Sequence, residues 1–135
     1  MSPDQASRRL ISSGAPWERR VGYSRAVRVG AMVFVSGTTA AEPDGGVVGH
    51  DDLRAQTRET LRRIDSALHE AGARLDQVVR TRIFITDISR WEEVAEIHGE
   101  VFGDIRPAST MVEVAALIDP TLLVEIEADA VIASG

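Results

Sequence analysis

The sequence has no cysteine and few aromatic residues, which make up 4% of its 135 positions. Without cysteine, disulfides, thiolate catalysis and cysteine-ligated metal or iron–sulfur sites are excluded. This composition fits a reducing compartment. No stretch combines clustered basic and aromatic residues, and the net charge is −6. Since phosphate backbones favour a basic surface, no nucleic-acid partner is expected and a ribonuclease activity ranks low.

Long apolar runs are also missing. No segment approaches the length that spans a bilayer. Residues 1–13 are polar, contain Arg8 and Arg9, and lack the apolar run of a signal peptide. We therefore expect a cytoplasmic protein with no membrane partner.

The chain length predicts one domain over residues 1–135. A hydrophobic content of 44% is enough for a core, and 27% charged residues is typical of a folded chain. At the N-terminus, residues 7–12 carry a weak strand pattern, and residues 14–20 indicate a loop that contains Pro16 and Trp17. Residues 1–20 are thus expected to be loosely structured.

The most informative stretch is residues 105–130. Two apolar-rich runs, 105–117 and 122–130, flank a proline turn, which is typical of a hairpin. The second run alternates strictly and places three carboxylates on one strand face: Glu125, Glu127 and Asp129. Either a solvent-exposed face or a polar cavity explains this row.

The preceding elements follow from periodicity and capping signals. The first is a hairpin over 23–29 and 31–36, followed by a helix that runs from Asp51 or Asp52 to near Ala71 and is stopped by Gly72. A strand over 78–86 comes next, with Val79 and Thr81 on one face. A second helix is started by a Ser89–Glu92 capping box and closed by Gly103. Helices that alternate with strands predict an α+β domain with a mixed sheet and both helices on one face. The opposite face, with Phe84, Val131 and charged residues, is expected to meet another subunit.

Most other signals favour ordinary structural roles. The glycine-rich segment 42–49 is followed by no lysine and matches no nucleotide motif, so we interpret it as a loop. His50, His69 and His98 lie far apart and lack metal-ligand spacing, so no metal site is expected. Ser36 has no nucleophile-elbow context; Ser36-Gly37 is either a plain strand end or a point of close ligand approach.

The carboxylate row allows two interpretations. Arg80 and Arg82 have the same two-residue spacing on another strand, so pairing of the two strands would form a ladder of ion pairs. Alternatively, one carboxylate stays unpaired and activates a water molecule at a subunit interface.

Four segments resemble one known family. They read Val-Phe-Val-Ser-Gly at 33–37, Val-Arg-Thr-Arg-Ile-Phe-Ile-Thr-Asp at 79–87, Pro-Ala-Ser-Thr-Met-Val-Glu-Val at 107–114 and Val-Glu-Ile-Glu-Ala at 124–128. In order and spacing they are similar to the reactive intermediate deaminase (Rid or YjgF-like) family, formerly described as endoribonuclease L-PSP. The likeness covers about residues 22–131. It implies a chorismate-mutase-like fold and a homotrimer with clefts between subunits. It also implies cofactor-free hydrolysis of reactive imines and enamines to ketoacids and ammonia.

Carried over position by position, the resemblance gives a set of site residues. Glu125 corresponds to the catalytic, water-positioning glutamate; the substrate-binding positions are Tyr23, Ser36, Gly37, Ser109, Thr110 and Met111, with His98 nearby. Ser109 stands where the family's deaminases have an arginine that binds the substrate carboxylate. A serine offers one hydroxyl in place of a charged fork. The asparagine sometimes found on the second helix is absent too, since residues 94–96 read Val-Ala-Glu.

Two functions remain open. The first is a hydrolase or deaminase of a small imine, enamine or related C–N compound, with no cofactor and with Glu125 acting on water. The loss of the arginine argues against standard 2-aminoacrylate deaminase activity and suggests a neutral substrate, or one anchored through Ser109, Thr110 or His98. The alternative is a non-catalytic trimeric protein that binds a small molecule or regulates a partner.

Overall fold

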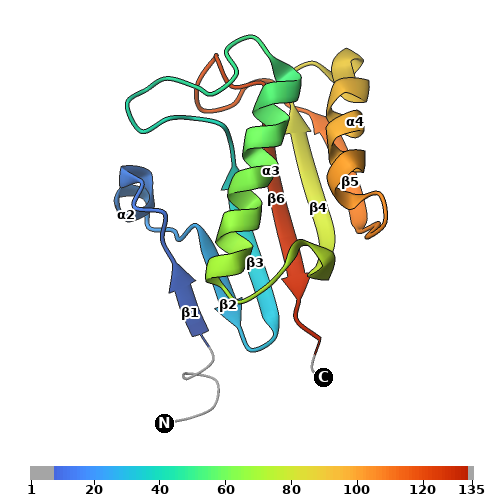
Figure 1. Cartoon of the computed structure of the whole chain (residues 1–135). Helices are drawn as coiled ribbons and strands as arrows, with labels where there is room; N and C mark the ends of the chain where they lie inside the picture. The colour runs from blue at the N-terminus through green and yellow to red at the C-terminus, as the bar shows by residue number, and fades with distance from the viewer. Residues whose placement is uncertain (1–7, 134–135) are drawn as a thin grey trace.

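A computed structural model describes residues 8–133 and shows one sheet with helices packed against it (Figure 1). Its elements are β1 (Arg8–Ile11), α2 (Pro16–Val21), β2 (Ala26–Val29), β3 (Met32–Thr38), α3 (Leu53–Glu70), the 3-10 turn η1 (Leu75–Gln77), β4 (Val78–Ile85), the 3-10 turn η2 (Ile88–Arg90), α4 (Trp91–Phe102), β5 (Ala108–Glu113) and β6 (Val124–Val131). The strand order is β1-β2-β3-β6-β4-β5, with β4 and β5 parallel and every other neighbouring pair antiparallel. Both α3 and α4 cover the same face (Figure 1), so the expected mixed sheet is confirmed.

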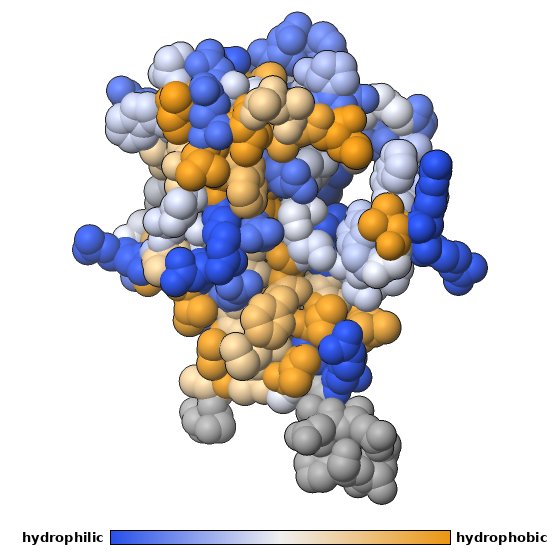
Figure 2. Space-filling model, turned by 180° about the vertical axis from the view of Figure 1, so that it is seen from behind, coloured by the Kyte–Doolittle hydropathy of each residue, from blue (hydrophilic) through white to orange (hydrophobic). Residues whose placement is uncertain are grey.

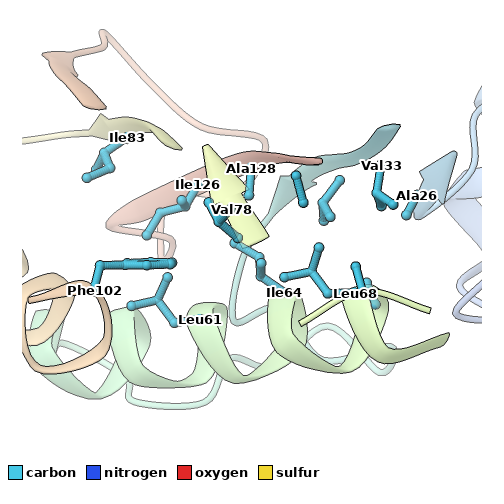
Figure 3. Packing of buried hydrophobic residues seen from close by; sticks show 14 of the residues in the cluster. Ala26, Val33, Leu61, Ile64, Leu68, Val78, Ile83, Phe102, Ile126 and Ala128 are labelled. Atoms are coloured by element: carbon cyan, nitrogen blue, oxygen red, sulfur yellow. The ribbon is translucent and has the colours of Figure 1, made fainter. Parts of the chain in front are cut away.

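Helix α3 forms where its capping and periodicity predict. The Asp52 side chain accepts a hydrogen bond from the Ala55 amide at 3.0 Å, which satisfies one of the free amides at the helix start. Gly72 follows the helix with φ of 87°, a conformation that glycine adopts without strain. Five residues spaced four, four, three and four apart form one stripe along the helix, and all of them are buried: Leu53, Thr57, Leu61, Ile64 and Leu68. Figure 3 shows Leu61, Ile64 and Leu68 packed against sheet residues such as Val33 and Ile126. Burying each large aliphatic side chain contributes about 1.5–3 kcal/mol.

The start of α4 differs from the expected capping box. Asp87 accepts hydrogen bonds from the Ser89 amide at 3.0 Å and from its hydroxyl at 2.6 Å. These contacts form the η2 turn, so Ser89 lies inside the turn and the residue before α4 is Arg90, whose side chain makes no cap hydrogen bond. The capping-box prediction was therefore wrong, because an aspartate two residues earlier binds the serine first. The end at Gly103 is confirmed.

The predicted hairpin over residues 105–130 is absent. Strand β5 pairs in parallel with β4, and β6 lies between β3 and β4. The segment β4–α4–β5 is thus a crossover unit, and β5 is an edge strand. Periodicity gave both strands correctly, but it does not specify which strands pair.

The alternation in β6 is confirmed. Val124, Ile126, Ala128 and Ala130 are buried toward the helices, and the three carboxylates lie on the opposite face. In β4 a register shift between Val78 and Arg80 makes Val78, rather than Val79, the buried residue that precedes Thr81. The bulge explains this error in the predicted face.

The face opposite the helices is open in the monomer. Apolar side chains lie exposed on it beside charged ones, including Met32, Phe34, Val112 and Val131. Figure 2 shows this side, with an apolar region toward the lower end and hydrophilic groups above it. That another subunit covers this face stays a prediction from the sequence.

The N-terminal region is more regular than expected. Strand β1 pairs with β2, and α2 replaces the loop predicted over residues 14–20. Pro16 stands at the first helical position, and the Glu18 carboxylate accepts hydrogen bonds from the Ser13 amide and hydroxyl. Residues 8–20 are therefore not loosely structured, while residues 1–7 lie outside the described part of the chain. No helix within residues 8–133 has the length and apolarity needed to cross a membrane.

Candidate functional site

A cavity of about 680 Å³ lies beside the end of β3. Its walls come from the N-terminal segment, α3, the loop after β3, the loop before β6, and β6 itself. Among the residues that line it are Trp17, Val21, Tyr23, Arg25, Gly37, Arg62, Arg63, Ile118 and Glu125. Three of the sequence-predicted site residues, Tyr23, Gly37 and Glu125, are thus brought together.

Glu125 differs from the other two carboxylates of its row. No cationic side chain within residues 8–133 lies at ion-pair distance from it. Burial raises the pKa of Glu125, the charge of Arg25 opposes that rise, and Glu127 adds to it. A carboxyl group that ionises less readily than usual is suited to accept and return a proton.

Gly37 determines how closely a backbone can approach this carboxylate. A Cβ at Gly37 would overlap Glu125 Oε2, so only glycine leaves the acid in its place. The Gly37 carbonyl accepts a hydrogen bond from Arg25 Nη2, and the Arg25 guanidinium lies 5.8 Å from the centre of the Tyr23 ring. Arg25 therefore contacts the tyrosine ring and the glycine carbonyl, and its charge acts on the acid from beyond ion-pair distance.

Ser36 has a different environment from the one expected. Its hydroxyl donates to the Ser24 carbonyl at 2.6 Å, and its amide donates to the Arg25 carbonyl at 3.0 Å. The side chain does not line the cavity. It fixes the segment that carries Arg25, which is a positioning role.

Three of the remaining predicted residues, His98, Ser109 and Met111, form a second group on the helix side of β5. The Thr81 hydroxyl lies 2.9 Å from His98 Nε2 and donates to Ser109 Oγ at 2.8 Å. Burial lowers the pKa of His98, which favours a neutral ring, and that ring packs on Phe102 with centroids 4.7 Å apart. Ser109 thus takes part in a hydrogen-bonded chain of neutral groups where the resemblance would place a cation.

The two groups lie on different faces of the sheet. Ser109 is in register with buried Thr81, so its side chain points to the helix side, as does that of Met111. Thr110 is in register with Arg82 and points the other way, as does Glu125. One protomer therefore does not bring Ser109 and Glu125 into a single pocket.

The rest of the carboxylate row forms the expected ion pairs. Arg82 Nη1 lies 3.3 Å from Glu127 and 3.2 Å from Asp129. The ladder interpretation is confirmed for these two acids, and Glu125 is the one without such a partner among the described residues. Arg80 makes no ion pair within that part of the chain.

No set of three or more histidine, aspartate or glutamate side chains in residues 8–133 is arranged to hold a metal ion.

Comparison with known proteins supplies the family. The family model described as Endoribonuclease L-PSP matches residues 15–132. The chain belongs to the endoribonuclease L-PSP family. Its L-PSP relatives include a RutC family protein of Pyrococcus abyssi, 35% identical over 106 residues, which covers 78% of this chain and 83% of the relative.

Solved structures of L-PSP relatives share the fold. Rv2704 from Mycobacterium tuberculosis, described as a member of the highly conserved YjgF/YER057c/UK114 family, is 59% identical, with a TM-score of 0.85 and coverage of 93% of this chain and 100% of that one. YyfA from Yersinia pestis, of the conserved Rid family, is 36% identical, with a TM-score of 0.82 and the same coverage. The family and fold expected from the motifs are confirmed. That Ser109 marks a separate L-PSP branch stays a prediction.

Two residues of this L-PSP site were missed at the sequence level. Arg25 stands just before an apolar strand and showed no motif, although its place two residues after Tyr23 is a signal that could have been used. Thr81 was assigned to a strand face without its link to Ser109, because strand register cannot be read from periodicity.

Proposed function

We propose that the protein is a cofactor-free hydrolase that removes ammonia from an imine, an enamine or a related C–N compound, with Glu125 acting on the attacking water. The observation that carries this proposal is a carboxylate of raised pKa, with no ion-pair partner among residues 8–133, at the wall of a cavity beside a glycine backbone. Family membership supports the general class of chemistry but does not identify a substrate.

The chemistry follows from that placement. The water oxygen bonds to the imine carbon while a water proton passes to Glu125. The acid returns this proton to nitrogen, which gives a carbinolamine. Glu125 then carries the hydroxyl proton to the amino nitrogen as the C–N bond breaks, and the products are a carbonyl compound and ammonia. The sequence has neither lysine nor cysteine, so a covalent intermediate on those residues is not available, and we assign water as the nucleophile.

The complete site, in this proposal, forms between copies of the chain. Ser109 and Glu125 point to opposite faces, and Ser109 lies on the edge strand β5. Only a second copy can bring one residue near the other. A homotrimer is the assembly expected from the resemblance, and light scattering of the purified protein tests it. A monomer at micromolar concentration would contradict the two-copy site.

The activity is tested by ammonia release from a panel of enzymatically generated imines. Glu125→Gln removes the proton acceptor with little change of shape, and we expect the rate to fall about 100-fold or more. Glu127→Gln is the matched control, because Glu127 lies two residues away on the same face but pairs with Arg82. Equal rates for wild type and Glu125→Gln would disprove the role of Glu125.

The second candidate function is binding without turnover. Ser109, neutral and hydrogen-bonded to Thr81, favours it, since the position that holds a cation in the family's deaminases is uncharged here. A ligand that raises the melting temperature, with no ammonia released from any imine tested, would favour this candidate. A cytoplasmic location remains a prediction from the sequence under either function.

A further inference from the structure

Three arginines line the cavity, and they differ in how their charge is balanced. Arg63 donates to the Thr39 and Ala41 carbonyls at 2.9 and 2.6 Å and pairs with both Glu42 and Glu59. Arg62 forms two hydrogen bonds to Glu59, at 2.8 and 2.6 Å. Both guanidinium groups are therefore already neutralised by carboxylates.

Arg25 has no such partner within residues 8–133. Its Nη2 donates to the Gly37 carbonyl, a neutral group, and its Nε is buried without a hydrogen-bond partner. A guanidinium has five N–H donors and binds carboxylates through two of them at once. Of the three cavity arginines, Arg25 is thus the one with charge and donors to offer a ligand.

Two acids lie within electrostatic reach of Arg25, but neither forms an ion pair with it. Glu18 is held by the Ser13 amide and hydroxyl, and Glu125 lies beyond ion-pair distance. Glu125 also repels a bound anion. A direct two-point contact with the guanidinium outweighs that repulsion, because Coulomb energy falls with distance and hydrogen bonds add to the nearer interaction.

The cavity also has an apolar mouth, which we define as Trp17, Val21 and Ile118. These side chains are 51%, 69% and 83% exposed, and they come from α2 and from the loop between β5 and β6. Exposed apolar side chains around one opening are typical of a binding site. The volume of about 680 Å³ suits a ligand much larger than a three-carbon imine, since pockets of roughly 300–1,000 Å³ hold drug-sized molecules.

We propose that this cavity binds an amphipathic organic carboxylate, with the charged head on Arg25 and an aromatic or aliphatic body against the apolar mouth. Arg25 is then a specificity-determining residue that supplies the cation absent at Ser109. The assignment rests on the proposed function only in placing the C–N bond of such a substrate beside Glu125.

Calorimetry with three probes tests the proposal on wild-type protein. They are 3-phenylpropanoate, its neutral amide 3-phenylpropanamide, and propanoate, which has the head but no aromatic body. We expect the phenyl acid to bind roughly tenfold or more tighter than either of the other two. An amide that binds as tightly as the acid, or no measurable binding of the phenyl acid, would overturn the inference.

Two arginine variants separate a specific contact from general charge. Arg25→Gln should weaken 3-phenylpropanoate roughly tenfold or more and leave the amide unchanged. Arg62→Gln removes an equal charge from the same cavity wall and should change affinity less than about threefold, since that arginine is already paired with Glu59. Equal losses in both variants would contradict a specific role for Arg25. If Arg25→Gln does not fold, Arg25→Lys and the wild-type comparison of acid with amide still decide.

The test of turnover and the test of binding can fail independently of each other. Glu125→Gln should slow ammonia release about 100-fold or more and still bind 3-phenylpropanoate. Binding that depends on Arg25, with no ammonia released by wild type, would retain this inference and reject the proposed function. Ammonia release without any preference for the phenyl acid would reject this inference and retain the proposed function.

Discussion

The contact between Gly37 and Glu125 gives a prediction that needs no knowledge of the substrate. In Gly37→Ala the new Cβ would overlap Glu125 Oε2 and lie 3.0 Å from Cδ and 3.4 Å from Cγ. Overpacking of this kind costs about 1–3 kcal/mol. Since the obstructing atom is the far end of a flexible side chain, it can rotate aside, and we expect a loss of about 1 kcal/mol.

A double-mutant cycle isolates this contact. In Glu125→Ala the obstacle is gone, so adding Gly37→Ala should cost almost nothing, and the coupling energy should be about 1 kcal/mol. For a chain of this size that corresponds to a difference of about 4 °C in melting temperature. All four proteins are compared by thermal unfolding at one protein concentration, because association makes the melting temperature depend on concentration.

Gly46→Ala is the control for the cycle. Its Cβ would meet only Asp44 Oδ1 at 3.5 Å, an ordinary contact, so little change in stability is expected. Effects of Gly37→Ala and Glu125→Ala that add within about 0.3 kcal/mol would refute the close approach of glycine and acid. So would a Gly46→Ala loss as large as that of Gly37→Ala.

Three further predictions concern pH and buried polar groups. Because the folded pKa of Glu125 is raised, the ionised acid opposes folding at a pH above both its folded and its unfolded pKa. Glu125→Gln should therefore melt at a higher temperature than wild type at about pH 8 and at the same temperature at about pH 3. A wild type that melts higher than Glu125→Gln at about pH 8 would contradict the raised pKa. Hydrogen bonds from Arg62 lower the pKa of Glu59 to about 2, so the stability that this carboxylate adds is complete above about pH 4.5 and is lost as the pH falls toward 2. In urea unfolding at a series of pH values, Glu59→Gln should therefore lose less stability than wild type between about pH 4.5 and 2. An equal loss in the two proteins would contradict this prediction. Thr81→Val keeps the shape but leaves His98 Nε2 without its partner, which should cost about 1–3 kcal/mol in urea unfolding, and a neutral result would show that the link to Ser109 and His98 is dispensable.

The sequence predicted best the elements whose pattern is local. Helix α3 is eighteen residues long, with a capping aspartate and an apolar stripe, and each of these signals acts within the helix itself. The alternation of β6 was equally clear. By contrast, α2 has six residues, too few to show a period of 3.6, and its start depends on Glu18 binding back to Ser13.

Errors arose where a structural feature depends on partners far along the chain. The pairing of β5 with β4 and the insertion of β6 between β3 and β4 are tertiary choices, so two consecutive strand patterns looked like a hairpin. The bulge at Val79 reversed one predicted face for the same reason.

The same reasoning explains why the row of acids could not be resolved from sequence. Glu125, Glu127 and Asp129 are equivalent by strand spacing, but β4 places Arg82 beside two of them. At Glu125 the neighbouring strands offer Phe84 on one side and, past the register shift of β3, the glycine at 37 on the other. Neither can pair with a carboxylate through its side chain, so this half-buried acid has no ion-pair partner among residues 8–133, and its partial burial raises its pKa. The candidate catalytic group is thus selected by what its neighbours lack, and an arginine in place of Phe84 would convert it into a third rung of the ion-pair ladder.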